Sequence, residues 1–317
     1  MELWIPITVA AALFQNIRTA LQKHLKGRLD TTGATYARFL YAVPFTWVYL
    51  SLVSSFESLT FSSTSILPNT NMEFLFYGML GGIAQILATF ILVWLFGQRN
   101  FAVGTSLTKT EAIQTAIFGL ILLGDTLTIQ ATAGILVSLT GVLTLYRKTN
   151  PTSTQPRISK TNFIKSIGNL LTQDKSILPG ITAGALFALA SVSYRAASLS
   201  LGGEGFMIQS AYTLAWVTGF QTLAMGGYLL IKKPDILIRV LKCWRAAIWV
   251  GMTGMLGSAG WFTAMTLENA AHVRTLGQIE LIFTLIIGYI FFKERLTRKE
   301  IFGVSLITAG ILTLIIE

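Results

Sequence analysis

The chain has 317 residues, of which 53% are hydrophobic and 12% are charged, and its formal net charge is +10. Soluble domains carry about a quarter charged residues, so this composition excludes an ordinary soluble protein. One cysteine and two histidines cannot build a disulfide framework or a zinc or haem site, and no cofactor is expected.

The apolar residues occur in blocks of about 20, the length at which an α-helix crosses a hydrocarbon core of ~30 Å. The period-two alternation of a transmembrane barrel does not occur in them. The sequence therefore predicts an all-α polytopic membrane protein with ten transmembrane helices, at residues 3–22, 31–52, 74–96, 101–123, 126–146, 177–198, 205–230, 247–267, 272–292 and 297–316. The first block lacks a basic leader and a clear cleavage site, so it is predicted to be a span.

Lys and Arg are unevenly distributed between the two sets of loops. They concentrate in the loops that follow odd-numbered spans. The opposite side holds only Arg274 and collects acids such as Glu57, Asp125 and Glu204. The positive-inside rule therefore predicts cytosolic basic loops and both termini outside, in a cell (inner or plasma) membrane. The positive charge is a topology signal, and no nucleic-acid partner is expected.

Two segments of the chain repeat each other without gaps. Residues 107–145 align with residues 276–314 at a constant offset of 169. Each half holds five spans, and an odd number reverses the second half, which predicts two inverted five-helix repeats. We expect the first repeat at 1–148, a cytosolic linker with a short amphipathic segment at 149–176, and the second repeat at 177–317. Inverted repeats are typical of secondary transporters, with the site near the midplane.

The repeated block carries the same polar stripe twice. An acid, a hydroxyl and a glycine recur at i, i+4 and i+8, as Glu111, Thr115 and Gly119 and as Glu280, Thr284 and Gly288. Both glutamates are expected about ten residues into their spans, ~15 Å deep and near the midplane. An intramembrane charge costs about 2.5–3.5 kcal/mol, so something must offset it. Each carboxylate either binds a proton, a cation or substrate, or holds helices together through hydrogen bonds, and the sequence leaves both readings open.

The repeated block is similar to the closing segments of EamA-type permeases, ten-span members of the drug/metabolite transporter superfamily. Their domains typically end in Glu-Pro, an apolar span, an acidic residue before Leu-Thr or Leu-Ser, and a helix with two glycines. The matching residues here are Glu111, Asp125-Thr126-Leu127-Thr128, Gly134 and Gly141, and then Glu280, Glu294-Arg295-Leu296-Thr297, Gly303 and Gly310. Ala112 and Leu281 replace the proline, so the kink of the family pattern is not expected. The resemblance implies a transporter of small metabolites or drugs and leaves the substrate open.

Other intramembrane polar residues are less regular. Lys109 has Gln278 at its repeat position, and it points about 200° away from Glu111 on a helix. We expect Lys109 to snorkel toward the cytosolic face or to meet an acid, a carbonyl or an anionic substrate. Arg18 and Arg38, nearer to the cytosolic span ends, are expected to snorkel.

Three further features add candidates. Arg195, near the outer leaflet, is expected either to pair with Glu204 or to form an outer gate. Tyr212 and Trp216, four residues apart in the seventh span, either line a cavity for cations or rings, or pack in the core or against lipid. Glycines recur every third residue in the eighth span, at Gly251, Gly254, Gly257 and Gly260. Such a run predicts close helix contact.

These features predict a secondary transporter of small metabolites or drugs that works by alternating access, with proton or exchange coupling as an option. Glu111 and Glu280 are the main coupling or anchoring candidates. An intramembrane enzyme or a channel-like pore is the alternative, although no GxSxG, HExxH or GxxxxGK[ST] pattern and no filter-like loop occurs in the sequence. A small-molecule substrate and the lipid bilayer are the expected partners, and a homodimer is left open.

Overall fold

The computed structural model describes residues 2–61, 67–97, 108–146, 177–203, 205–292 and 297–316. Within these ranges all regular secondary structure is α-helical, so the predicted all-α class is confirmed. Among the described residues, four helices are long and apolar enough to cross a membrane, at Thr31–Ser58, Met72–Leu95, Ile177–Ser200 and Phe206–Lys232. Two shorter helices, at Glu111–Leu123 and Ile129–Leu145, are also apolar.

The helices fall into an N-terminal part before the predicted linker and a C-terminal part after it. The N-terminal part holds α1 (Trp4–Lys26), α2 (Thr31–Leu40), α3 (Val43–Phe61), α4 (Met72–Leu95), α6 (Glu111–Leu123) and α7 (Ile129–Tyr146). The C-terminal part holds α9 (Ile177–Ser200), α10 (Phe206–Lys232), α11 (Pro234–Lys242), α12 (Trp244–Leu267), α13 (Ala270–Leu276), α14 (Ile279–Phe292) and α15 (Arg298–Ile315). The linker predicted at 149–176 lies outside the described residues.

Short polar side chains and one glycine define several helix ends. At the start of α2, Asp30 Oδ1 accepts a hydrogen bond from the Gly33 amide at 3.0 Å, and Asn71 accepts one from the Phe74 amide at 2.7 Å at the start of α4. Gly124, with φ of 68°, follows α6 in the left-handed conformation that favours glycine. The residues beside these helices therefore set where they begin and end.

Two of the predicted spans are interrupted. The span predicted at 31–52 is divided into α2 and α3, and the span at 272–292 is divided into α13 and α14. At the second break, a Cβ on Gly277 would lie 2.5 Å from the Trp261 ring, so glycine permits the close approach. The protein buries this break, since Gln278 within it is 1% exposed, and buried non-helical backbone is tolerated even inside a membrane. As a consequence, Glu280 lies at a helix start.

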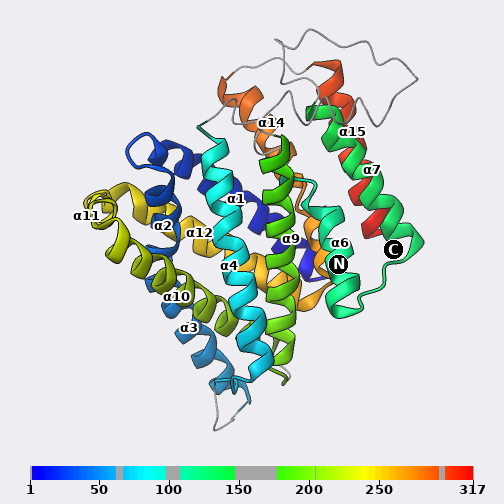
Figure 1. The fold of residues 1–317 in the computed structure, drawn as a ribbon. Coiled ribbons are helices and arrows are strands. Elements are labelled where there is room, and N and C mark those ends of the chain that lie inside the picture. Colours follow the sequence, from blue (N-terminus) through cyan, green and yellow to red (C-terminus); the bar gives the residue numbers. More distant parts are fainter. Residues whose placement is uncertain are drawn as a thin grey trace.

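The helices pack in pairs that join the two parts of the chain (Figure 1). α1 lies against α12, α4 against α9, α3 against α10 and α7 against α15. The α7–α15 contact is close: a Cβ on Gly134 would lie 2.8 Å from the Gly310 carbonyl oxygen, and one on Gly141 would lie 2.6 Å from that of Gly303. Small residues allow two helix backbones to approach in this way.

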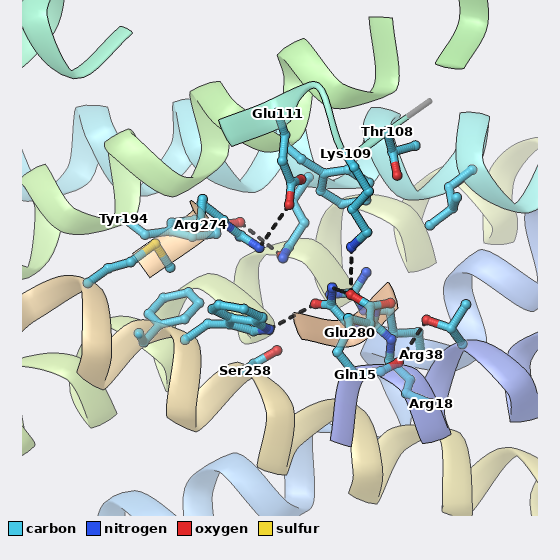
Figure 2. A pocket seen from close by; sticks show the side chains of 17 residues that line it. Gln15, Arg18, Arg38, Thr108, Lys109, Glu111, Tyr194, Ser258, Arg274 and Glu280 are labelled. Carbon is cyan, nitrogen blue, oxygen red and sulfur yellow. Dashed lines mark hydrogen bonds and ion pairs between the residues drawn. The ribbon is translucent and has the colours of Figure 1, made fainter. Parts of the chain in front are cut away.

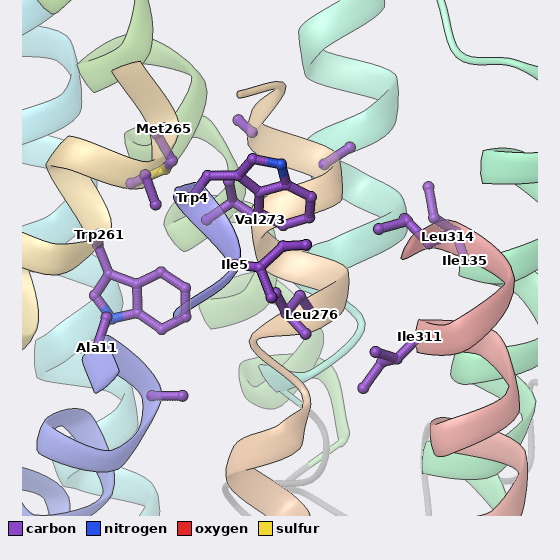
Figure 3. Packing of buried hydrophobic residues seen from close by; sticks show 14 of the residues in the cluster. Trp4, Ile5, Ala11, Ile135, Trp261, Met265, Val273, Leu276, Ile311 and Leu314 are labelled. Carbon is purple, nitrogen blue, oxygen red and sulfur yellow. The ribbon is translucent and has the colours of Figure 1, made fainter. Parts of the chain in front are cut away.

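Gly257 and Gly260 of the glycine run in α12 face α1. A Cβ on Gly260 would lie 2.8 Å from Ala11 Cβ, and one on Gly257 would lie 3.3 Å from the Gln15 nitrogen. The predicted close contact is therefore confirmed for these glycines. Buried apolar residues continue the packing from this contact toward α13, α7 and α15, and include Trp4, Ile5, Ala11, Ile135, Trp261, Met265, Val273, Leu276, Ile311 and Leu314 (Figure 3). The cluster fixes Trp261 beside Gln15 at the edge of a polar cavity.

Candidate functional site: a closed polar cavity

Glu111 and Glu280 both lie in the first turn of a helix. Glu111 is the first residue of α6 and Glu280 is the second residue of α14, and both are buried. Neither glutamate therefore lies in the middle of its helix, and their expected position about ten residues into the predicted spans, near the midplane, stays a prediction. The helix start exposes unpaired amides and the positive end of the helix dipole, which stabilise a negative charge there.

The two carboxylates face one cavity (Figure 2). Its lining comes from α1, α2, α4, α9, α12, α13 and α14, from the first residue of α6 and from the segment just before it. The free space inside is about 30 Å³. This is enough for water and far below the roughly 300–1,000 Å³ of a ligand pocket, so the lining side chains nearly fill the cavity. Among the described residues, no group of three or more His, Cys, Asp or Glu is placed to hold a metal ion.

Glu280 is held by two donors on one oxygen. Lys109 Nζ lies 2.6 Å from Glu280 Oε2, and Gln15 Nε2 donates to the same oxygen at 2.8 Å. Trp261 Nε1 donates to Gln15 Oε1 at 2.8 Å and thereby fixes the orientation of the amide. Of the alternatives predicted for Lys109, the structure has an acid as its partner.

Glu111 has a more distant partner. Arg274 Nη1 lies 3.5 Å from Glu111 Oε1, while Arg274 Nε donates to Ser191 Oγ at 2.8 Å. The guanidinium also lies 4.6 Å from the centroid of the Trp261 ring, a cation–π distance. Sequence reasoning placed Arg274 on the outer side and missed this role. The available signal was that Arg274 is the only Lys or Arg in the loops predicted on the outer side.

The two ion pairs cross between the N-terminal and C-terminal parts of the chain. Lys109, from the N-terminal part, holds Glu280 of the C-terminal part, and Arg274 of the C-terminal part holds Glu111 of the N-terminal part. All four side chains point into the cavity in Figure 2. Two reciprocal ion pairs therefore join the N-terminal and C-terminal parts of the chain at the cavity.

Two further cations line the same cavity. Arg18 of α1 and Arg38 of α2 are 4% and 5% exposed, so the predicted snorkelling is wrong. The Arg18 stem instead lies beside α12, where a Cβ on Gly254 would be only 3.4 Å from Arg18 Cδ. Arg38 Nη1 donates to Thr89 Oγ1 at 2.7 Å. Arg18 Nε is buried and has no hydrogen-bond partner among the described residues.

The hydroxyls of the two stripes bond to their own helices. Thr115 Oγ1 donates to the Glu111 carbonyl at 2.7 Å, and Thr284 Oγ1 donates to the Glu280 carbonyl at 2.9 Å. Thr284 Oγ1 also accepts a hydrogen bond from Asn16 Nδ2 of α1 at 3.1 Å. Neither threonine is among the described residues that line the cavity. In this closed structure they support the helix starts that carry the carboxylates.

Gln278, the repeat counterpart of Lys109, takes a different partner. It lies in the break between α13 and α14, is 1% exposed, and its Oε1 accepts a hydrogen bond from Ser138 Oγ of α7. Its Nε2 has no hydrogen-bond partner among the described residues. Gln278 thus connects the break between α13 and α14 to α7 by a hydrogen bond, whereas Lys109 faces the cavity.

Arg195 lies apart from the cavity and joins three elements. Its Nε lies 3.5 Å from Asp125 Oδ2 after α6, and its Nη1 donates to the Glu268 carbonyl at the end of α12 at 2.5 Å. The Glu268 carboxylate lies 3.0 Å from His272 Nδ1, and this hydrogen bond holds the pKa of the Glu268 carboxyl below its ordinary value. Glu204, the partner expected from the sequence, lies outside the described residues.

Tyr212 and Trp216 lie on another face of the bundle. Both line an apolar groove of α3 and α10 with Trp47 and Leu50. The Phe74 ring lies 5.7 Å from the Tyr212 ring and 5.4 Å from the Trp216 ring, between centroids. Neither aromatic residue is among the described residues that line the polar cavity.

Comparison with known proteins identifies the C-terminal part. Residues 176–316 match the EamA-like transporter family, so the chain carries an EamA-like transporter domain there, consistent with the drug/metabolite transporter superfamily. The domain and the apolar helices support a multi-pass membrane protein and a membrane transporter in general. Members of this family are transporters and not enzymes.

Two further comparisons concern curated proteins and solved structures. A search of curated proteins finds no match. A solved structure described as "Crystal structure of protein" is similar over 96% of this chain and 98% of its own, with a TM-score of 0.55 and 16% sequence identity. At this identity the likeness concerns the fold alone.

Proposed function

We propose that this chain is a secondary transporter that moves a small molecule through the central cavity by alternating access. The observation that carries the proposal is the pair of reciprocal ion pairs, Lys109–Glu280 and Arg274–Glu111, in a closed cavity between the two parts of the chain. Alternating access requires two bodies that meet at a site and can separate on either side of it. Ion pairs that join the two parts of the chain at the cavity are suited to control when these parts separate.

The arrangement of the helices supports two inverted five-helix repeats. Exchanging the two parts of the chain turns the α1–α12 contact into the α9–α4 contact, and both contacts are present. The offset of 169 pairs Gly134 with Gly303 and Gly141 with Gly310. Exchanging the two parts of the chain therefore turns the Gly134–Gly310 contact into the Gly303–Gly141 contact, and both contacts are present. We propose ten spans on this basis, with the interrupted second and ninth spans each made of two helices.

Coupling is proposed to act on the two glutamates. A proton on Glu111 or Glu280, or a substrate that competes for Lys109 or Arg274, removes one of the attractions that close the cavity. The equilibrium then shifts toward an open state, because the closed state has lost interaction free energy. The two carboxylates are therefore the coupling residues in this proposal, and Lys109 and Arg274 are the gating cations.

Counterflow tests the transport proposal. Purified protein is screened for ligands by thermal shift, and the best ligand is assayed in proteoliposomes. A carrier accelerates uptake of labelled ligand when unlabelled ligand is trapped inside, whereas a channel or an intramembrane enzyme does not. Absence of such acceleration for a ligand that binds and enters the liposomes contradicts alternating access.

Substitution of the glutamates tests the coupling proposal. Glu111→Gln and Glu280→Gln retain the shape of the side chain and remove its ionisation. We expect at least one of them to abolish the pH dependence of uptake. Unchanged pH-dependent uptake in both variants contradicts a coupling role and leaves counterflow, and thus transport, standing.

The orientation is a separate proposal with its own test. We propose cytosolic basic loops and both termini outside, from the distribution of Lys and Arg. A cysteine introduced at position 317, in a Cys243→Ser background, should react with a membrane-impermeant reagent added from outside intact cells. Reaction only after the cytosolic side is exposed reverses the orientation.

A further inference from the structure

We infer that the central cavity binds a small anion, recognised through a carboxylate or phosphate group. The inference rests on the proposed transport function and adds the chemical class of the substrate. It follows from the charges of the described cavity lining, in which two acids, Glu111 and Glu280, face four cations, Arg18, Arg38, Lys109 and Arg274. Two positive charges are left without a carboxylate.

The surplus belongs to Arg18 and Arg38. Lys109 and Arg274 are engaged with the two glutamates, whereas neither Arg18 nor Arg38 forms an ion pair with another described residue. Arg38 has a neutral hydroxyl as its partner, and Arg18 Nε has none among the described residues. Buried charges without a counter-charge are unfavourable, and in membrane proteins such residues mark substrate and ion pathways. A ligand with negative charge supplies the missing partner.

The guanidinium groups of Arg18 and Arg38 suit a ligand that carries a carboxylate or phosphate group. A guanidinium presents a planar fork of donors that matches the paired oxygens of a carboxylate or a phosphate. In Figure 2, Arg18 and Arg38 lie below Glu280, whose carboxylate Lys109 reaches from above. An anion held by Arg18 is therefore well placed to compete with Glu280 for Lys109, which links its binding to the opening of the cavity.

A cationic substrate fits the same cavity poorly. Both carboxylates already have cations of the chain beside them, at 2.6 Å for Glu280 and 3.5 Å for Glu111. A ligand cation would have to displace these tethered groups and then lie close to four positive side chains. Like charges in a water-poor site repel strongly, because little solvent screens them.

The test measures binding to the full-length protein purified in detergent. Its thermal unfolding midpoint is recorded with sodium phosphate, sodium succinate, choline chloride and sodium chloride at equal ionic strength. We expect phosphate or succinate, and neither chloride salt, to raise the midpoint. A shift with phosphate alone assigns a phosphate group, and a shift with succinate alone assigns a carboxylate. A shift with choline chloride alone, or no shift with either anion, contradicts the inference.

Arg18→Gln locates the site, with Arg28→Gln as the matched control, because Arg28 is exposed in the turn after α1. We expect Arg18→Gln to weaken anion binding about ten- to a hundredfold and Arg28→Gln to leave it unchanged. Without anion, Arg18→Gln should unfold at the same temperature as the wild type or higher, because the surplus charge is reduced. An anion shift that persists in Arg18→Gln contradicts the inference.

Two measurements keep the inference testable if Arg18→Gln does not fold. Arg18→Lys retains the charge and loses the fork, so its anion affinity should fall below that of the wild type. Wild-type proteoliposomes are also assayed for counterflow with labelled phosphate, succinate and choline. Counterflow of choline and of neither anion overturns the anion class while the transport function stands. Absence of counterflow for every probe that shifts the midpoint counts against the proposed function itself.

Discussion

Glu280 and Glu111 occupy matching positions of a duplicated segment, yet their surroundings differ. Glu280 is fixed by Lys109 and Gln15 at 2.6 and 2.8 Å, and its helix is joined to α1 through Asn16. Glu111 has one cation at 3.5 Å, and that cation is shared with a serine and a tryptophan ring. The two acids thus lie at similar helix starts, and the residues around them differ.

The difference suggests separate roles for the two glutamates. A carboxylate with two short charge-assisted or neutral donors is held in one geometry. A carboxylate whose single partner is distant and has other contacts changes its protonation or its partner with less loss of interaction. We expect Glu280 to anchor the closed state and Glu111 to be the more readily switched of the two.

The largest effect is expected from removing the cation of each pair. Lys109→Met leaves Glu280 buried without its charge partner, and we expect a loss of about 3–5 kcal/mol in stability. Arg274→Met should cost less, about 1–3 kcal/mol, because the Glu111 contact is longer. Unfolding of the detergent-purified variants gives both values. Equal losses contradict the proposed difference between the two glutamates.

A double variant separates loss of the pair from loss of packing. Lys109→Met combined with Glu280→Gln removes the charge that the single variant leaves unpaired, so part of the stability should return. Transport should remain impaired, since both the gating cation and the coupling acid are gone. A double variant less stable than Lys109→Met shows that the lysine acts through something other than Glu280.

An intermediate effect is expected at the second donor to Glu280. Gln15→Leu removes the hydrogen bond to Oε2 and also leaves Trp261 Nε1 without its acceptor, and we expect a loss of about 1–3 kcal/mol. Trp261→Phe removes the indole donor, whose hydrogen bond is worth about 1 kcal/mol, and it also shortens a buried ring that packs against Gly277 and Arg274. Thermal unfolding compares the two. A larger loss in Trp261→Phe means that ring packing, including the contact with Arg274, outweighs the orientation of Gln15.

The sequence predicts the all-α membrane class and the two polar stripes that begin at Glu111 and Glu280. It does not predict which charged side chains form ion pairs. Apolar blocks and the offset of 169 are readable because they depend on residue type and spacing alone. The helix breaks before Glu280 and the burial of Arg18 depend on contacts with α12, through Trp261 and the glycines beside it. Arg18 and Gly254 lie more than 200 positions apart in the chain, and Gly277 meets Trp261 from a different helix, so local sequence patterns carry no record of either contact.

The smallest effect should come from the paired threonines, Thr115 and Thr284, which differ by one hydrogen bond. Thr115 and Thr284 both donate to the carbonyl of the glutamate four residues before them, and only Thr284 also accepts from Asn16. Valine keeps the shape and removes the hydroxyl, so Thr284→Val should exceed Thr115→Val in destabilisation by about 1 kcal/mol, the worth of one hydrogen bond. The two variants serve as each other's control, because the lost bond within the helix is the same in both. Thermal unfolding measured on the two proteins side by side gives the difference. A larger loss of stability in Thr115→Val would mean that the position of Glu111 depends strongly on the hydrogen bond from Thr115 to its carbonyl. Glu280 would then not be the anchor of the closed state.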